Sequence, residues 1–249
     1  MGRLAGKCAL ITGGTTGIGL ETARQFLREG ARVMITGNNQ GNMETAQREL
    51  GSDISAVISD AADANAQKQV AAKVREQFGT LDVLFVNAGM VDMRPIEQFD
   101  EAAFDRSFAI NLKGPYFLIQ SLLPVFANPA SIIMNASVNA HIGMPNTSVY
   151  AATKAALASL VRTLSGELIG RGIRVNAVSP GPVATLLYGK LGFTEAELKN
   201  VAASIQGQVP AKRFGTPSEI ASAVVFFASD ESAFTVGSEL LIDGGMSNI

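Results

Sequence analysis

Residues 7–23 read KCALITGGTTGIGLETA, a short apolar run that breaks into a glycine-rich turn and opens directly into a helical pattern. Gly13 suits the tight turn, Gly17 lets the backbone approach a pyrophosphate, and Gly19 permits close packing of helix on strand. The start of the helix offers free N–H groups to an anion. Glycine turns after strands are often merely structural, but this Gly-x-x-x-Gly-x-Gly spacing stands in the strand-to-helix context that such a binding site requires.

Beyond this turn, short β-rich runs alternate with longer helical patterns. We expect strands at 7–12, 31–36, 54–59, 81–86, 130–136, 173–178 and 238–242. We expect helices at 17–29, 40–50, 63–78, 100–113, 114–127, 149–169 and 217–229. This alternation indicates an α/β fold of the Rossmann type: a doubly wound, seven-stranded parallel sheet with helices on both faces.

Polar and turn residues follow the expected strands at their carboxyl ends. These residues are Thr12, Gly37, Asp60, Asn87, Ser137 and Pro180. Ligands of open α/β sheets bind at this edge, so the six positions predict a cleft there.

Tyr150 and Lys154 lie four residues apart in an alanine-rich stretch, and Ser137 lies thirteen residues upstream of the tyrosine. If 149–169 is helical, the two side chains share one face, where the ammonium favours the phenolate. Lowering the phenol pKa by roughly three units needs about 4 kcal/mol, which is more than a solvated lysine gives alone. A lone Tyr-x-x-x-Lys pair is usually a solvated pair, and the glycine-rich turn is what favours a proton-transfer site here.

The ordered motifs resemble the short-chain dehydrogenase/reductase family, in its form of roughly 250 residues, over nearly the whole chain. The matching residues are Thr12-Gly13-x-x-x-Gly17-Ile18-Gly19, Asp60, Asn87-Ala88-Gly89, Asn111, Ser137, Tyr150-x-x-x-Lys154, Pro180-Gly181 and Asp243-Gly244-Gly245. The resemblance implies one domain over 1–249 and an NAD(P)-dependent oxidoreductase that acts on a small-molecule ketone or secondary alcohol. Two other readings are an oxoacyl-carrier or sugar/polyol-specific dehydrogenase and a non-catalytic dinucleotide-binding regulator on the same fold.

The resemblance implies four catalytic residues. Tyr150 would be the general acid in carbonyl reduction and the general base in alcohol oxidation, and Ser137 would hydrogen-bond the substrate oxygen. Lys154 would lower the phenol pKa and bind the nicotinamide ribose, and an oxidised nicotinamide ring would add a second positive charge. Asn111 would hold a water that links the lysine to solvent, although an asparagine in a helical pattern can also distort the helix and satisfy backbone groups.

The same resemblance implies a set of cofactor contacts. Thr185 would contact the carboxamide, Asn87 and Gly89 the adenosine ribose, and Asp60 the adenine. The full set is Gly13, Thr15, Thr16, Gly17, Ile18, Gly19, Gly37, Asn38, Asn39, Asp60, Asn87, Ala88, Gly89, Tyr150, Lys154, Pro180, Gly181, Val183 and Thr185.

The end of the second expected strand bears on cofactor choice. An Asp at Gly37 would select NAD by accepting from the 2′-hydroxyl, and it is absent. No basic residue stands at Thr15, Thr16 or Asn38 to bind the 2′-phosphate of NADP. Thr36, Asn38 and Asn39 can donate neutral hydrogen bonds. We expect NADP(H) to be favoured over NAD(H), with dual use open.

Residues 182–216 form a long connection that carries a helical stretch at 194–206, which is typical of a substrate lid. Its apolar residues, Leu186, Leu187, Tyr188, Leu191 and Phe193, indicate a hydrophobic substrate unless they pack on the lid's own helix. We expect a substrate pocket that includes Asn139, His141, Leu187 and Tyr188.

Composition excludes several other classes. The net charge of -2 and the lack of a basic stripe argue against nucleic acid, and no apolar run or leader pattern suggests a membrane span or a signal peptide. The single cysteine, Cys8, fits a reducing cytoplasm. A single His141 offers no metal site, and Ser137 lacks the Gly-x-Ser-x-Gly elbow of a serine hydrolase.

The expected helix from Val149 to Gly170 carries more small residues than packing on one sheet requires. In the family, this helix and the one before it pair with symmetry mates, and the C-terminal strand forms a second contact. Two isologous interfaces predict a homotetramer. The alanines could also reflect helix propensity alone, in which case a monomer is expected.

Overall fold

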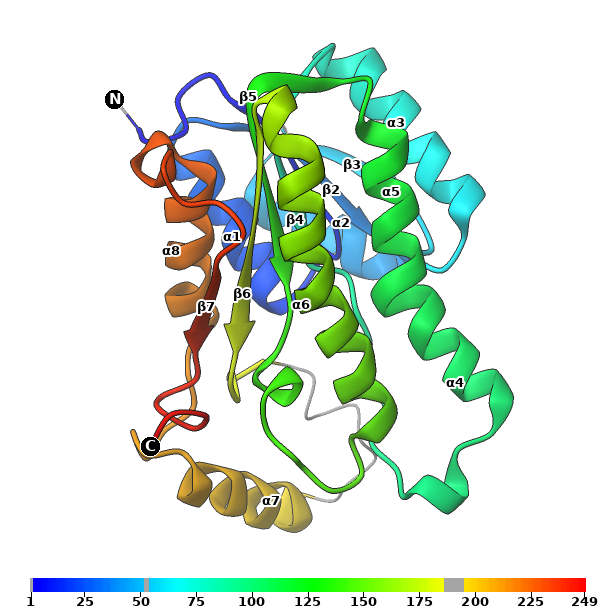
Figure 1. The fold of residues 1–249 in the computed structure, drawn as a ribbon, viewed down its shortest axis with the longest axis vertical. Helices are drawn as coiled ribbons and strands as arrows, with labels where there is room; N and C mark the ends of the chain where they lie inside the picture. The colour runs from blue at the N-terminus through cyan, green and yellow to red at the C-terminus, as the bar shows by residue number, and fades with distance from the viewer. Residues whose placement is uncertain (1, 52–53, 186–194) are drawn as a thin grey trace.

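The strands of this chain pair in parallel to form one sheet. The computed structural model describes residues 2–51, 54–185 and 195–249, and within them seven strands pair in the order β3-β2-β1-β4-β5-β6-β7 (Figure 1). They are β1 Cys8–Ile11, β2 Arg32–Gly37, β3 Ser55–Ile58, β4 Leu81–Val86, β5 Phe126–Asn135, β6 Ile173–Pro180 and β7 Glu239–Ile242. The predicted Rossmann-like parallel sheet is confirmed.

Helices cover both faces of this sheet. They are α1 Gly17–Arg28, α2 Gln40–Leu50, α3 Ala64–Phe78, α4 Glu101–Phe108, α5 Gly114–Leu122, α6 Ser148–Leu168, α7 Glu195–Gln208 and α8 Pro217–Ala228. Buried side chains of α1, α2 and α8 pack on one face, and those of α3, α5 and α6 pack on the other. The helix α7 lies beyond the carboxyl ends of the strands (Figure 1). None of the described helices is long and apolar enough to cross a membrane.

Successive residues of the central strands alternate between two apolar clusters. Leu10 and Leu84 face α3, α5 and α6, whereas Ile11 and Phe85 face α1 and α8, and all four are fully buried. Burial of one such side chain contributes about 1.5–3 kcal/mol. The nearly continuous apolar runs in the sequence therefore arise because both faces of the sheet are covered.

Two helix predictions need correction. The helix expected at 114–127 ends at Leu122, because Pro124 lacks an N–H and its ring clashes with the preceding turn. The chain then enters β5 at Phe126, four residues before the expected strand, and Phe126 pairs with Leu81. The helix expected at 100–113 ends as α4 at Phe108 and continues as one π-helical turn, Ala109–Lys113.

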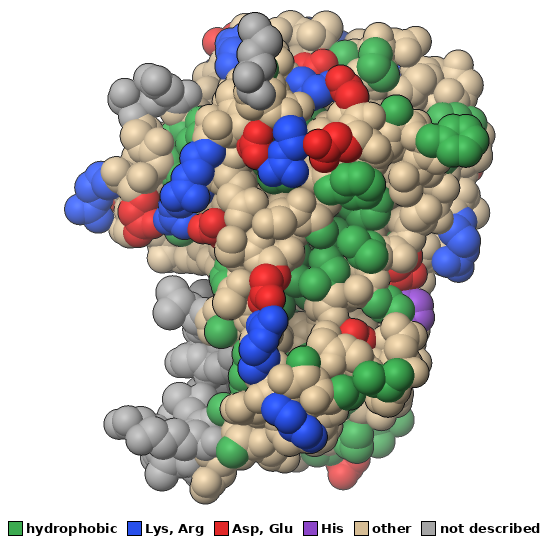
Figure 2. All heavy atoms as spheres, turned by 90° about the vertical axis from the view of Figure 1, so that its left-hand side faces the viewer, with side chains coloured by type: hydrophobic (Ala, Val, Ile, Leu, Met, Phe, Trp, Pro, Cys, Tyr) green, Lys and Arg blue, Asp and Glu red, His purple; other side chains and the backbone are tan. Residues whose placement is uncertain are grey.

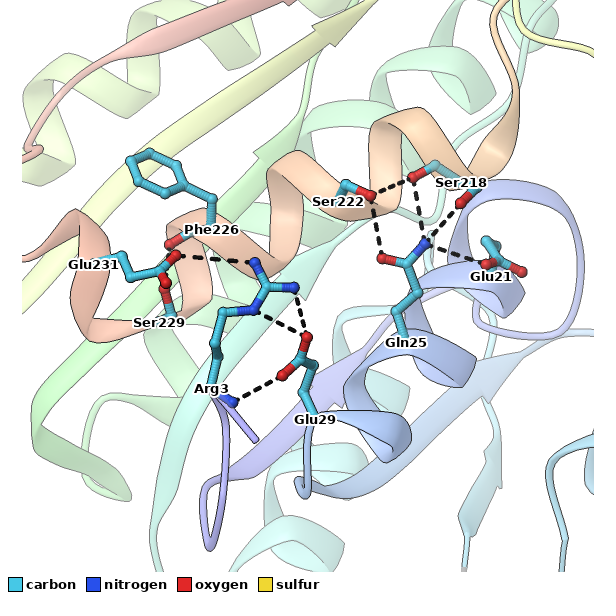
Figure 3. A network of polar contacts seen from close by, with 9 residues as sticks. All are labelled: Arg3, Glu21, Gln25, Glu29, Ser218, Ser222, Phe226, Ser229 and Glu231. Carbon is cyan, nitrogen blue, oxygen red and sulfur yellow. Dashed lines mark hydrogen bonds and ion pairs between the residues drawn. The ribbon is translucent and has the colours of Figure 1, made fainter. Parts of the chain in front are cut away.

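Polar contacts on the surface join the N-terminal segment, α1 and α8 (Figure 3). Arg3 donates from its backbone and its guanidinium to Glu29, and Gln25 Nε2 donates to Ser218 Oγ at 3.0 Å. Exposed ion pairs contribute roughly 0–1 kcal/mol each. We conclude that apolar packing, rather than this network, holds α1 against α8.

Candidate active site

The strand order reverses at β1, which lies between β2 and β4, so the carboxyl ends of β1 and β4 form a topological switch point. Hydrogen bonds hold the ends of β1 and β4 together at this point. Thr12 Oγ1 accepts from the N–H groups of Asn87 and Ala88, both at 2.9 Å. Asn87 Nδ2 donates to the carbonyls of Thr12 and Gly13, at 2.9 and 3.1 Å. The glycine-rich turn is thereby held against the end of β4.

Glycine is required at two positions of this turn. Gly13 and Gly17 have φ values of 62° and 56°, a region that residues with a Cβ rarely adopt. The Thr16 side chain makes no capping hydrogen bond to α1, so the first N–H groups of this helix can bind an anion. Gly19 is buried, and a Cβ there would lie 2.2 Å from the carbonyl oxygen of Gly13. Gly19 therefore serves packing and does not line the cavity beside the turn.

That cavity has a volume of about 470 Å³. Of the expected cofactor contacts it is lined by Gly13, Thr15, Thr16, Gly17, Ile18, Gly37, Asn38, Asp60, Asn87, Ala88, Gly89 and Thr185. Glycine backbone, hydroxyls and amides line this cavity at a helix N-terminus. These groups fit a dinucleotide, because a pyrophosphate needs close backbone approach and N–H donors.

Besides Gly19, sequence reasoning placed one further residue in this cavity wrongly, and it missed others. Asn39 does not line it, because its side chain caps α2 by accepting from Asn42 N at 2.9 Å. Asn42 lines the cavity instead. Gln67 also lines it and holds the loop after β3 by donating to the carbonyl of Asp60 at 2.8 Å. Nothing in the local pattern of α3 distinguished Gln67 from the other polar residues of the helix.

A second cavity, of about 500 Å³, contains the proton-transfer residues. Ser137, Tyr150 and Lys154 line it together with Pro180, Gly181, Val183 and Asn139. The two cavities share wall residues, namely Ile18, Asn87, Gly89, Met90 and Thr185. The remaining wall is mostly apolar and includes Val91, Met93, Val138, Met144, Pro182, Ile205 and Met246. These apolar residues come from loops and α7, where no periodic pattern marks them.

The helix α6 carries Tyr150 and Lys154 one turn apart. Lys154 Nζ lies 5.8 Å from the centre of the Tyr150 ring and donates to the carbonyl oxygen of Asn135 at 2.6 Å. Burial lowers the pKa of Lys154 to about 8. Burial also raises the pKa of Tyr150, and a hydrogen bond with the Ser137 hydroxyl opposes that rise. The phenol therefore keeps its proton at neutral pH.

The π-helical turn is built around Asn111. Its Oδ1 accepts from Met90 N at 2.8 Å, and its Nδ2 donates to Met90 O and to Thr153 Oγ1, both at 3.0 Å. A Cβ built on Gly89 would lie 3.3 Å from Asn111 Oδ1 and 3.6 Å from Lys154 Nζ. Asn111 thus satisfies the backbone of Met90 and lies next to Gly89, but it lines neither cavity.

The Ser137 hydroxyl is oriented by its own loop. Ser137 begins a short 3₁₀ turn, Val138–Ala140, and its Oγ accepts from Asn139 N at 3.2 Å. The hydroxyl donates to Asn139 Oδ1 at 3.3 Å, and Asn139 Nδ2 in turn donates to Thr147 Oγ1 at 3.2 Å. Asn139 therefore both lines the cavity and fixes the serine.

His141 does not line either cavity, contrary to the expectation from sequence. Its Nε2 lies 2.7 Å from Glu239 Oε1 at the start of β7, and that carboxylate also accepts from Ser179. This pairing with β7 turns the imidazole away from the cavity. The other two expected pocket residues, Leu187 and Tyr188, lie outside the described residues. In the described part of the chain, no group of three or more His, Cys, Asp or Glu residues could hold a metal ion.

Known proteins match the chain along almost its full length. A family model described as enoyl-(acyl carrier protein) reductase matches residues 13–247. Oxidoreductase asL5 of Sarocladium schorii is 38% identical, over 99% of this chain and 98% of that protein. The 3-oxoacyl-[acyl-carrier-protein] reductase FabG of Thermotoga maritima is 35% identical, over 98% of this chain and 99% of that protein. A short-chain glucose/ribitol dehydrogenase structure from Brucella melitensis superimposes with a TM-score of 0.91 at 32% identity, covering 99% of both chains.

Proposed function

Because this chain belongs to the short-chain dehydrogenase/reductase family and is an oxidoreductase that acts on CH–OH groups, we propose that it interconverts a hydrophobic ketone and its secondary alcohol, with Tyr150 as acid and base. One observation carries this proposal: Ser137, Tyr150 and Lys154 line one cavity, which shares a wall with the glycine-rich cavity at Gly89. A pure binding module has no need for the three groups to converge beside the dinucleotide site.

The proposed mechanism rests on proton transfer by the residues of this wall. A bound nicotinamide supplies the hydride in reduction and accepts it in oxidation. The Tyr150 hydroxyl donates its proton to the carbonyl oxygen as negative charge develops there, and Ser137 hydrogen-bonds the same oxygen. Lys154, whose pKa burial lowers to about 8, can exchange a proton near neutral pH and so helps to reprotonate the phenolate.

The wall of the second cavity supports a hydrophobic substrate. Its residues beyond the proton-transfer set are mostly apolar, and four of them are methionines: Met90, Met93, Met144 and Met246. Methionine adapts its shape to irregular apolar ligands. Lys154 is the one charged side chain among the described residues of this wall, which disfavours a polyol as the preferred substrate. Ile205 of α7 contributes to the wall, which supports the proposal that residues 182–216 form a lid.

A substrate panel tests this function. The wild-type protein is assayed by nicotinamide absorbance with hydrophobic ketones and alcohols, with sugars and polyols, and with 3-oxoacyl thioesters. We expect the highest kcat/KM with a hydrophobic ketone. Higher kcat/KM with polyols or oxoacyl thioesters would instead support the dehydrogenases of those classes. Dinucleotide binding without turnover of any class would identify a regulator and contradict the proposal.

For the cofactor, we propose a preference for NADP(H) over NAD(H). The absence of a carboxylate at Gly37 supports it, and Thr15, Asn38 and Asn42 are among the polar residues that line the same cavity. A Cβ at Gly37 would lie 2.6 Å from Thr15 Cγ2, so the double variant Gly37→Asp/Thr15→Ala is the better test. Its carboxylate should repel the 2′-phosphate and reverse the ratio of kcat/KM values. A wild-type protein that prefers NADH tenfold would refute the preference.

For assembly, we propose a homotetramer, and for location the cytoplasm, where the buried thiol of Cys8 stays reduced. Apolar side chains are exposed on α8, on β7 and on the segment that joins them, a side of the molecule shown in Figure 2. They include Phe226, Phe234, Val236 and Leu240, and Phe234 is fully exposed. Phe104 of α4 and Tyr116 of α5 are also exposed. Two separate apolar surfaces suit the two interfaces of a tetramer.

A further inference from the structure

Asn135, the last residue of β5, has an amide whose orientation is fixed. Its Nδ2 donates to Asn87 Oδ1 at 2.9 Å. Asn87 Nδ2 is committed to the carbonyls of Thr12 and Gly13, so the oxygen end of the Asn87 amide must face Asn135. The other end of the Asn135 amide is therefore an oxygen, and Asn135 lines the second cavity two residues before Ser137.

This oxygen lacks a hydrogen-bond partner. Asn135 Oδ1 is buried, and no donor contacts it within the part of the chain that the structure describes. A buried amide oxygen without a partner costs folding free energy and is uncommon in native proteins. The Nδ2 end of this amide is used by Asn87 Oδ1, whereas the described part of the chain makes no use of the Oδ1 end, so this oxygen points to a donor that arrives with a ligand.

The backbone of Asn135 indicates which ligand this is. Its carbonyl oxygen accepts from Lys154 Nζ at 2.6 Å, so Asn135 adjoins the lysine that the family resemblance assigns to the nicotinamide ribose. Asn135 lines the second cavity only, whereas the proposed function assigns the adenosine half of the cofactor to the first cavity. The candidate donors to Oδ1 are therefore those of the nicotinamide half, which are the ribose hydroxyls and the carboxamide NH₂.

We propose that Asn135 is an additional cofactor-binding residue, whose Oδ1 accepts a hydrogen bond from the nicotinamide half of the dinucleotide. The inference rests on the proposed function. Asn135 also links the two ends of the site, because a chain of hydrogen bonds runs from the glycine-rich turn through Asn87 and Asn135 to Lys154.

Asn135→Leu tests this role by calorimetric titration without substrate. The variant should bind NADP⁺ about tenfold more weakly, which corresponds to the loss of one hydrogen bond. Its affinity for 2′,5′-ADP, which lacks the nicotinamide half, should equal that of the wild type. Equal losses of affinity for both ligands would show that Asn135 acts only through Asn87. No loss of affinity for either ligand would leave Oδ1 without a role. Each of these outcomes would overturn the inference.

A cofactor analogue identifies the donor. In 3-acetylpyridine adenine dinucleotide phosphate a methyl group replaces the carboxamide NH₂. If that NH₂ is the donor, wild type and Asn135→Leu bind the analogue equally well. If a ribose hydroxyl is the donor, the variant binds the analogue about tenfold more weakly. Both results support the proposal.

Asn176→Leu is the matched control. Asn176 is a fully buried asparagine on β6, and its amide is satisfied by Thr235 O and Ser238 N. Its loss should lower the melting temperature but leave NADP⁺ affinity unchanged. Asn135→Ser, which leaves room for a water beside Asn87, gives the same comparison if the Leu variant is unstable. A wild-type protein that binds no dinucleotide would refute the proposed function, whereas tight wild-type binding with an unaffected Asn135→Leu would refute this inference alone.

Discussion

Burial controls the protonation of Tyr150 and Lys154, two titratable side chains that lie one turn apart on α6 and line the candidate site. It lowers the pKa of Lys154 to about 8 and raises that of Tyr150. Both shifts favour the neutral form, since a charged group loses hydration when it is buried. Tyr150 therefore retains the proton that carbonyl reduction needs. The burial of Lys154 lowers the free energy of unfolding at pH values below 8.

Lys154→Met should reveal this cost. A lysine whose pKa falls from 10.5 to about 8 on folding destabilises the folded state below pH 8. The destabilisation disappears as pH rises from 8 to 10.5, so the free energy of unfolding of the wild type should rise relative to that of the variant, by about 3 kcal/mol at most. Urea unfolding of both proteins across this pH range measures the difference. A difference that does not change with pH would contradict the pKa shift.

Single residues were predictable from sequence where a motif fixed their neighbours. Tyr150, Lys154 and Ser137 were found this way, because one helix and one strand end place them. His141 was misplaced because its partner Glu239 is 98 residues away. Asn135 was missed, since only the pairing with Asn87 reveals that one amide atom is left over.

Among the secondary-structure elements, the π-helical turn at Ala109–Lys113 depends most on one side chain. Asn111 makes hydrogen bonds with both backbone groups of Met90 and with Thr153 Oγ1. These bonds hold the loop after β4 against α6, and so they hold one wall of both cavities.

Asn111→Ala should lower the free energy of unfolding by about 3 kcal/mol, because it leaves several buried polar groups without partners. Thr216→Ala is the comparison. It removes the capping box of α8 and should cost about 1 kcal/mol. Urea denaturation at neutral pH measures both values. A loss for Asn111→Ala no greater than that for Thr216→Ala would show that the π turn does not need this residue.

The existence of the elements could be predicted, but some boundaries could not. Apolar periodicity and glycine turns mark elements locally, and they located each helix and strand of the sheet. The early start of β5 follows from the pairing of Phe126 with Leu81, a contact between distant segments. The end of α5 could have been predicted from Pro124, but the apolar residues on either side of this proline continue the helical pattern.

Across the entire chain, the parallel sheet and its two helical layers followed from the alternation of patterns. The strand order, with its reversal at β1, is a property of the tertiary structure and places the glycine-rich turn beside Asn87. The apolar residues of the substrate cavity come from separate segments, among them Met93, Met144, Ile205 and Met246, and only folding brings them together.

The proposed assembly predicts a mass in solution near four times the chain mass of 26.0 kDa. Leu240→Lys places a charge on the exposed edge of β7 and should halve the mass, because only one of the two interfaces is disrupted. Light scattering at micromolar concentration measures both proteins. A wild-type mass near that of one chain would contradict the tetramer and the role of the exposed apolar surfaces.

The comparison of Tyr150→Phe with Tyr116→Phe decides whether Tyr150 transfers the proton. Both changes remove one phenolic hydroxyl, but Tyr116 is exposed on α5 and lines neither cavity. Turnover of the best ketone from the substrate panel is measured with saturating cofactor. We predict that Tyr150→Phe lowers kcat by roughly 10² to 10⁴ with cofactor affinity retained, and that Tyr116→Phe leaves kcat unchanged. Near-normal turnover by a folded Tyr150→Phe protein would contradict the mechanism.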